Sequence, residues 1–254
     1  MKISVLASGS KGNSTYLEAN GTRLLIDIGM TSLYIEQKLK ELKIDPQTIN
    51  GVFLTHTHDD HIKGLRVFIK KYNPIVYLSE KMYAEISLRI SLPNYLFIDE
   101  TIVVDLLKVT IFKTSHDIDD SNGYIFEENN KSVVYITDTG YINIKHHDLL
   151  KNKDLYIMES NHEIELLMNG SYPHYLKQRI ISDRGHLSNL DSATYLSNFI
   201  GNKTKAIILI HLSEKNNDPE SALSILTKTL EKHNKMVDKI VIAKQNEKTE
   251  LMEI

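Results

Sequence analysis

The chain has 254 residues, a formal net charge of -3, 41% hydrophobic and 25% charged residues, and no cysteine. This balance is typical of a soluble globular protein and excludes a disordered or fibrous chain. Without cysteine there is no disulfide, thiolate metal ligand or cysteine nucleophile, so a transition metal would have to be bound by nitrogen and oxygen. Because the net charge is slightly negative, a nucleic-acid partner would have to contact a local basic patch.

No segment predicts export or insertion into a membrane. The apolar run at the N-terminus is too short for the core of a signal peptide. No stretch approaches the roughly 18 apolar residues that a membrane span needs. We therefore expect a cytoplasmic protein without a membrane partner.

Apolar, β-branched runs alternate with segments of helical period along nearly the whole chain. In the first part, the pattern predicts strands at Ile3–Ala7, Thr15–Ala19, Thr22–Ile28, Val52–Thr55, Ile75–Leu78, Leu96–Asp99, Ile102–Asp105 and Lys108–Lys113, and helices at Ser32–Leu42 and Ile62–Tyr72. In the second part, it predicts strands at Gly123–Glu127, Ser132–Thr137, Leu155–Met158, Ala206–Ile210 and Ile240–Ala243, and helices at Leu190–Phe199 and Pro219–His233. No linker or charge run separates the two parts, so we expect one α/β domain over residues 1–254.

The most informative stretch is the segment from His56 to His61, which reads His-x-His-x-Asp-His. It follows a short apolar strand and precedes a helical pattern, so its side chains converge where the strand ends. His56 and His58 can reach one ion, while Asp60 and His61 can turn toward a second, and such ligands suit zinc, manganese or iron. The alternative is a polar loop with a capping aspartate and solvated histidines.

Three further candidate ligands, His116, Asp138 and His211, also stand at the ends of apolar strands. Ligand sites of open α/β sheets lie at strand ends, so this recurrence favours a site. Taken alone, each of the three could be a turn residue. Together with the motif they complete two sets: His56, His58 and His116 for one ion, and Asp60, His61 and His211 for the other, with Asp138 bridging.

The order of these residues resembles that of the metallo-β-lactamase fold hydrolases. Five features match in sequence: Asp27 after an apolar strand, the His-x-His-x-Asp-His run, His116, Asp138 and His211. The resemblance covers essentially the whole chain and implies a four-layer αββα sandwich with two divalent ions at one edge, either zinc or manganese, with iron as a further option. It also implies that Asp27 is a buried carboxylate that supports the histidine loop. The alternative for Asp27 is a turn aspartate before Gly29.

Further segments are similar to the YycJ (WalJ) group of these hydrolases. They are Ser8–Ser14, Thr114–Asp117, Glu159–His162, Tyr172–Ile180, Ser182–Asn189 and His211–Asn217. This resemblance implies a cytoplasmic bacterial nuclease that degrades DNA from 5′ to 3′.

The residue types agree with a metal-dependent phosphodiesterase. Two close cations can bind the scissile phosphate, and a hydroxide that bridges them, aligned by Asp60, can attack the phosphorus. The leaving oxygen needs a proton, and the best spare donor is His186, which Glu159 at a strand end can hold in its acidic form. Alternatively, His186 is a structural residue at the start of a helix before Ser188.

A basic segment offers contacts for a nucleic-acid substrate. Lys177, Arg179 and Arg184 alternate with aromatic residues, a combination that can bind phosphates and stack on bases. The alternative is a solvated helical face. We expect DNA rather than RNA as the substrate.

Two other functional hypotheses stay open. The first is a small-molecule hydrolase for a thioester, lactone or β-lactam on the same dinuclear site, which would leave the Glu159 and His186 segments without a role. The second is a non-enzymatic, metal-stabilised binding module, which is disfavoured because no ligand position is lost. A fold by itself does not separate these functions.

Overall fold

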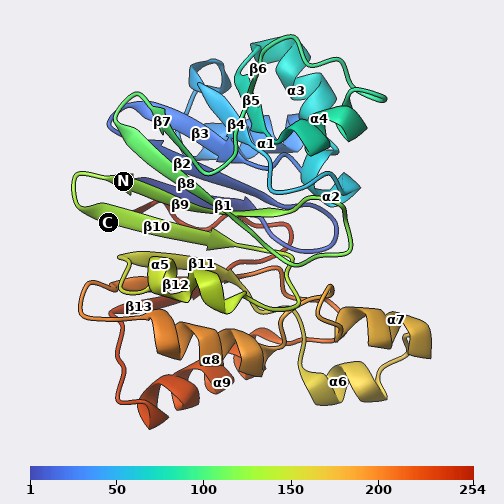
Figure 1. Cartoon of the computed structure of the whole chain (residues 1–254), viewed down its shortest axis with the longest axis vertical. Helices are drawn as coiled ribbons and strands as arrows, with labels where there is room; N and C mark the ends of the chain where they lie inside the picture. The colour runs from blue at the N-terminus through green and yellow to red at the C-terminus, as the bar shows by residue number, and fades with distance from the viewer.

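Two β-sheets stacked face to face, with helices on both outer surfaces, form the protein, and the computed structural model describes all residues from 1 to 254 (Figure 1). The four layers confirm the predicted αββα sandwich. None of the helices combines the length and the apolar character needed to traverse a lipid bilayer.

The strands fall into two groups of seven. The first sheet contains β1 (Lys2–Ala7), β2 (Ser14–Ala19), β3 (Thr22–Ile26), β4 (Gly51–Phe53), β5 (Ile75–Leu78), β6 (Tyr95–Phe97) and β14 (Met252–Glu253). The second contains β7 (Thr101–Val104), β8 (Leu107–Lys113), β9 (Asn122–Glu128), β10 (Lys131–Ile136), β11 (Leu155–Glu159), β12 (Ala206–Ile210) and β13 (Lys239–Ile242). The orders are β14-β1-β2-β3-β4-β5-β6 and β13-β12-β11-β10-β9-β8-β7.

Six helices cover the outer faces of the sheets. On the first sheet lie α1 (Ser32–Glu41), α3 (Leu65–Tyr72) and α4 (Glu80–Ile86), and on the second lie α5 (His147–Leu150), α8 (Asn189–Phe199) and α9 (Pro219–Lys232). Three short helices, α2 (Asp59–Ile62), α6 (Ile164–Asn169) and α7 (His174–Ile180), lie in connections near the edge of the sandwich (Figure 1). Two single 3-10 turns occupy Pro46–Thr48 and Ile144–His146.

Strand alternation divides the apolar side chains among three cores. On β10, Val133 and Tyr135 belong to the core between the sheets, whereas Val134 and Ile136 belong to the core under the helices of the second sheet. Successive side chains of a strand point to opposite faces, so a strand that is apolar at every position is buried on both sides. The continuous apolar runs of the sequence therefore become the inner strands of this four-layer structure.

Strand direction brings distant segments to one edge. In the first sheet β3 and β4 are parallel, and in the second β10, β11 and β12 are parallel. Carboxyl ends of parallel strands meet at the same edge, where ligand sites form. The residues that follow these strands and β8 are Asp27, the His56–His61 segment, His116, Asp138, Glu159 at the end of β11, and His211.

Three of these residues leave their strands in a left-handed backbone conformation. The φ angles are 61° at Asp27, 49° at Asp138 and 58° at His211. Residues with a Cβ avoid this region at a cost of roughly 1–2 kcal/mol, and such strain concentrates at functional sites. The sharp change of direction turns each side chain out of its strand and toward the edge of the sandwich.

The predicted helix Ile62–Tyr72 is wrong as a single element, because α2 ends at Ile62 and α3 begins at Leu65. The break is at Gly64, whose backbone N–H donates to the carbonyl of Ile28 at 2.9 Å. A Cβ at Gly64 would overlap the carbonyl oxygen of Met30. The chain leaves the helix here because the loop after β3 packs directly against it, a tertiary contact that helical periodicity does not report.

The segment Ser160–Gly185, which carries α6 and α7, leaves the sandwich and returns at one point (Figure 1). The N–H of Asn161 donates to the carbonyl of Leu187 at 2.9 Å, and the N–H of Asn189 donates to the carbonyl of His162 at 2.9 Å. These bonds close the base of the segment. Its two helices were not predicted as separate elements, since each has fewer than eight residues and little apolar period.

Gly29 provides a test of how tightly the loops at this edge are packed. Its N–H donates to the carbonyl of Asn13 at 2.8 Å, and an added Cβ would overlap the carbonyl of Asp60. We expect Gly29→Ala to lower the free energy of unfolding by about 3 kcal/mol in urea denaturation. As a control, Gly21→Ala has a left-handed backbone but open space, and should lose only about 1 kcal/mol. Equal losses in the two variants would contradict the close-contact explanation.

Candidate active site

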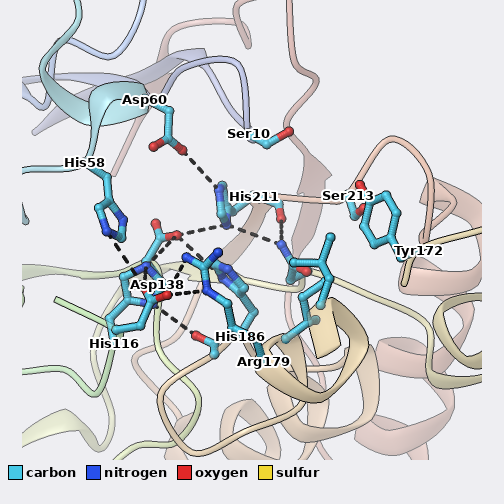
Figure 2. Close-up of a pocket in the computed structure, with 15 residues that line it drawn as sticks. Ser10, His58, Asp60, His116, Asp138, Tyr172, Arg179, His186, His211 and Ser213 are labelled. Atoms are coloured by element: carbon cyan, nitrogen blue, oxygen red, sulfur yellow. Dashed lines mark hydrogen bonds and ion pairs between the residues drawn. The ribbon is translucent and has the colours of Figure 1, made fainter. Parts of the chain in front are cut away.

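A pocket of about 270 Å³ opens at the edge where these strands end (Figure 2). Six of the residues that the sequence analysis selected as ligands or catalytic groups line it: His58, Asp60, His116, Asp138, His186 and His211. The other lining residues are Ser10, Asp117, Asn161, Tyr172, Leu176, Arg179, Ile180, Gly185 and Ser213. The pocket therefore joins the predicted ligands to a second group of residues that were not predicted as ligands.

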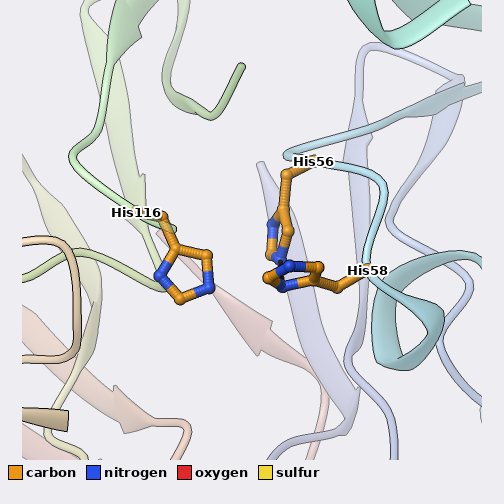
Figure 3. A group of neighbouring side chains, drawn as sticks. All are labelled: His56, His58 and His116. Carbon is orange, nitrogen blue, oxygen red and sulfur yellow. Dashed lines mark hydrogen bonds between the residues drawn. The ribbon is translucent and has the colours of Figure 1, made fainter. Parts of the chain in front are cut away.

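Three histidines from two loops form the first cluster (Figure 3). His56, His58 and His116 each offer one ring nitrogen, and these atoms lie within 4.8 Å of one another. The Nε2 of His56 is 3.1 Å from the Nδ1 of His58. Burial, together with the neighbouring histidines, lowers the pKa of His56 well below its usual value, so this ring is neutral. A neutral imidazole is the form that binds a metal ion.

Asp60, His61 and His211 form the second cluster, again within 4.8 Å. The carboxylate of Asp60 lies 3.6 Å from the Nε2 of His61 and 3.9 Å from the Nε2 of His211. The Nε2 of His211 is buried and has no hydrogen-bond partner. An unpaired buried polar atom is costly, and it marks a position where a ligand is expected.

Asp138 lies between the two clusters. One carboxylate oxygen is 3.1 Å from the Nε2 of His61, and the other is 3.9 Å from the Nε2 of His116 and 3.4 Å from the Nδ1 of His211. Burial opposes ionisation of this carboxyl, but the positive fields of His211 and His61 hold its pKa well below the usual range. The buried side chain is therefore an anion that touches both clusters.

Hydrogen bonds fix the orientation of three of the predicted histidine ligands. Each donates through Nδ1 to an acceptor on its outer side, which directs Nε2 toward the site: His61 to Asp27 at 2.8 Å, His116 to the carbonyl of Gly185 at 3.2 Å, and His211 to Glu159 at 2.8 Å. Partners of this kind set the tautomer and orient the ring of a metal-binding histidine. Nitrogen and carboxylate donors in this arrangement fit a divalent metal ion.

Asp27 supports the histidine loop from beneath. The carboxylate is completely buried and accepts hydrogen bonds from the N–H of Thr55 at 2.8 Å, the hydroxyl of Thr55 at 2.7 Å, and the ring of His61 at 2.8 Å. Burial lowers the tendency of His61 to take a proton, but Asp27, Asp60 and Asp138 outweigh burial and raise its pKa well above the usual value. Thr55 was not predicted to have a role, although it directly precedes the motif.

Asn13 is a second residue that the sequence analysis missed. Its Nδ2 lies 3.0 Å from the Nε2 of His61 and 3.4 Å from the carboxylate of Asp60, while its Oδ1 accepts from the N–H of Gly9 at 2.8 Å. The available signal was its place in the small-residue loop Ser8–Ser14 after an apolar strand. That loop enters the site only because β1 lies two strands away from β3.

Glu159 connects a predicted ligand to the predicted proton donor. It is completely buried, and one carboxylate oxygen accepts from the Nδ1 of His186 at 2.7 Å and from that of His211 at 2.8 Å. The other oxygen accepts the N–H groups of Thr139 at 3.1 Å and Leu187 at 3.3 Å. Burial opposes ionisation, but His186 and His211 together lower the pKa of Glu159 to about 2. With Nδ1 held by this anion, the other ring nitrogen of His186 faces the pocket (Figure 2).

Of the three predicted substrate-binding cations, Arg179 lines the pocket and Lys177 and Arg184 do not. The guanidinium of Arg179 is paired with Asp117, and this pairing, against the effect of burial, lowers the pKa of the carboxyl. Asp117 also lies 3.2 Å from the Nε2 of His116. It was part of the motif at His116 but was not assigned a role from the sequence.

Lys177 and Arg184 both contact backbone carbonyl groups. The ammonium of Lys177 donates to the carbonyl of Met168 at 2.7 Å, which ties α7 to α6. Arg184 donates to the carbonyls of His116 at 3.1 Å and Ile118 at 3.3 Å. Arg184 therefore holds the loop that carries His116.

Asp27→Asn tests whether the buried carboxylate controls metal binding. An asparagine has one side-chain oxygen in place of two, so it cannot accept all the hydrogen bonds that Thr55 and His61 donate. We therefore expect zinc affinity to fall by about 10- to 100-fold. Equilibrium dialysis of the refolded, chelator-treated protein measures this. The matched control is Asp59→Asn in the His56–His61 segment that Asp27 supports; the side chain of Asp59 is 88% exposed and pairs only with Arg89. The same loss of affinity in both variants would contradict the role of Asp27.

Comparison with known proteins places the chain in a family. The model of the beta-lactamase superfamily domain matches residues 22–212. The chain is 39% identical over 228 residues to Exodeoxyribonuclease WalJ of Streptococcus pneumoniae serotype 2 (strain D39 / NCTC 7466), covering 87% of this chain and 85% of that protein. It is 36% identical over 236 residues to Exodeoxyribonuclease YycJ of Bacillus anthracis, covering 91% and 89%. The metallo-beta-lactamase fold protein YhfI from Bacillus subtilis shares the fold, with a TM-score of 0.72 at 16% identity over 98% of this chain and 99% of that one. The chain is therefore a hydrolase of the metallo-β-lactamase superfamily, as the order of its motifs predicts.

Proposed function

We propose that this protein is a metal-dependent exonuclease that hydrolyses phosphodiester bonds of DNA from the 5′ end toward the 3′ end. The observation that carries the proposal is the position of Asp138, one buried anion between two three-residue clusters beside an open pocket. Such paired sites suit phosphoryl transfer. The two curated relatives that match most of the chain carry the name exodeoxyribonuclease, which supports the substrate and the reaction. The 5′-to-3′ direction rests on the resemblance to their group.

We assign seven ligands to two divalent ions, zinc or manganese. His56, His58 and His116 would hold the first ion, Asp60, His61 and His211 would hold the second, and Asp138, between the two clusters, would contribute to both. Two cations so placed would supply an activated water and would neutralise the charge that develops on the phosphate.

The ionised carboxylate of Asp60 orients the attacking water. Burial opposes its ionisation, but His61 and His211 lower its pKa below the usual value, so it is a hydrogen-bond acceptor at neutral pH. Its Oδ2 also accepts from Asn13 at 3.4 Å, which restrains the carboxylate toward the pocket. An acceptor fixed in this way aligns the water with the phosphorus.

His186 supplies the proton that the leaving oxygen requires. Glu159 holds its Nδ1 at 2.7 Å, so the Nε2–H faces the pocket and donates to the leaving group as the P–O bond breaks. The proton ends on the sugar oxygen that is released. Asp138 lies 3.5 Å from the Nδ1 of the same imidazole ring, on the side that Glu159 also contacts.

Arg179 contacts a phosphate of the strand. Its guanidinium lies at the pocket wall, and its planar donors match phosphate oxygens in a two-point contact. Asp117 holds the guanidinium in place before the substrate arrives. Lys177, on the same helix, would contact the DNA strand outside the pocket. Arg184 would affect substrate binding indirectly, because it holds the loop that carries His116.

The first experiment is cleavage of 5′-labelled and 3′-labelled single- and double-stranded DNA and RNA after chelation and re-addition of zinc or manganese. We expect metal-dependent release of nucleotides from one end of DNA. Asp138→Asn and His58→Ala should abolish this release while circular dichroism stays unchanged, because each removes a ligand from a site at the edge of the fold. The control is again Asp59→Asn, which should retain full activity. No strand cleavage with any metal, together with hydrolysis of a thioester or lactone, would replace the nuclease by a small-molecule hydrolase.

A second test addresses the proton donor. His186→Ala should slow cleavage of a natural phosphodiester, whose sugar alkoxide is a poor leaving group, by about 10²- to 10⁴-fold. The same variant should cleave a nitrophenyl phosphodiester nearly as fast as the parent enzyme, since nitrophenolate leaves without protonation. If both substrates lose the same factor, His186 does not act as the general acid.

A further inference from the structure

We propose that the part of the pocket beyond the ligand clusters binds the nucleoside of the terminal nucleotide, with the ring of Tyr172 as the surface on which the base stacks. This inference rests on the proposed nuclease function. It assigns a substrate-binding role to residues outside the metal ligands, the proton donor and the basic residues already described.

The outer part of the pocket is built from three separate segments. Figure 2 shows Tyr172 and Ser213 on the opposite side of the pocket from His58 and His116. Around them lie Ser10 from the loop after β1, Asn161 at the start of the α6–α7 segment, and Leu176 and Ile180 from α7. None of these six side chains is ionisable near neutral pH, so this part of the pocket does not attract a second phosphate.

Side chains of α7 form one wall. Leu176, Arg179 and Ile180 are spaced i, i+3 and i+4, so they share one face of the helix. Tyr172 lies in the connection just before the helix begins at His174. This face presents a cation near the clusters, where Arg179 pairs with Asp117, and apolar groups beyond it. A nucleotide has the same sequence of groups, a phosphate followed by a sugar and an apolar base.

Tyr172 is already positioned for stacking. The ammonium of Lys215 lies 5.5 Å from the centroid of its ring, and Lys215 does not line the pocket. One face of the ring is thus covered by the lysine, which leaves the other face available to the pocket. Aromatic side chains held in this way stack on bases of any sequence. Small polar groups at Ser10, Asn161 and Ser213 offer hydrogen bonds for the sugar.

The size of the pocket favours the end of a strand. Its volume of about 270 Å³ lies below the roughly 300–1,000 Å³ that is usual for ligand pockets, so it accepts one nucleotide unit and not a run of them. A pocket that holds a single nucleotide unit selects the terminal nucleotide, which accounts for cleavage from an end.

The experiment compares Tyr172→Ala, Tyr172→Phe and the control Tyr175→Ala on two oligonucleotides. Tyr175 is in α7, three residues after Tyr172, is 75% exposed and does not line the pocket. The first oligonucleotide is ordinary single-stranded DNA, and the second has an abasic residue at the end from which the parent enzyme releases nucleotides. We measure kcat/KM for the first release, with bis(p-nitrophenyl) phosphate as a substrate that has no base.

For the parent enzyme, loss of the terminal base should lower kcat/KM by about tenfold, the range expected for one stacked base. Tyr172→Ala should lose about the same factor on ordinary DNA and nothing more on the abasic strand, because the stacking partner is then already absent. Tyr172→Phe and Tyr175→Ala should match the parent enzyme on both strands. The control Tyr175→Ala should also hydrolyse bis(p-nitrophenyl) phosphate at the parent rate.

Two outcomes overturn the inference in different ways. If the parent enzyme cleaves DNA but Tyr172→Ala loses equally on both strands, or loses nothing on either, Tyr172 does not bind the base and the nuclease function stands. If the parent enzyme cleaves no DNA with any metal, the proposed function fails and the nucleoside pocket fails with it.

Discussion

The contact between Asp138 and His61 is the interaction on which the site depends. Asp138 follows β10 of the second sheet, whereas His61 belongs to the loop after β4 of the first, and their side chains meet at 3.1 Å. Neither sheet carries a complete ligand set. The two halves of the site are held together because the apolar core packs the two sheets against each other. A change that loosens this core would therefore also change the geometry of the site.

Buried charge at this edge is balanced locally. Three carboxylates, those of Asp27, Asp138 and Glu159, are withdrawn from water, and each accepts hydrogen bonds from groups that are themselves fixed by backbone or ring geometry. A buried charge without such partners would be prohibitively expensive. The surrounding histidines compensate these anions, which explains how a protein of net charge -3 holds so many carboxylates in one place.

Local patterns predicted an α/β domain, and the resemblance carried by its motifs implied the four-layer form. The same motifs drew attention to the residues that the structure brings together. The residues at the strand ends could be found from the sequence because each, such as His116 or His211, follows an apolar run. Their metal-binding roles stay predictions. The sequence did not predict the contacts that Asn13 and Asp117 make in the site, or the helix break at Gly64. Each depends on a contact between segments distant in the chain, such as Asn13 with His61 at 3.0 Å, and no local periodicity encodes such a contact.

The closed base of the Ser160–Gly185 segment has a consequence for how this enzyme can diversify. The segment begins directly after Glu159 and ends directly before His186, and these two residues are joined at 2.7 Å. Because the bonds at its base fix both ends, α6 and α7 can change in length or composition at a small entropic cost and leave the Glu159–His186 pair in place. Under the proposed function, substrate preference and bond-breaking chemistry would thereby be separable, and the segment could take on new specificities while the Glu159–His186 pair stays unaltered.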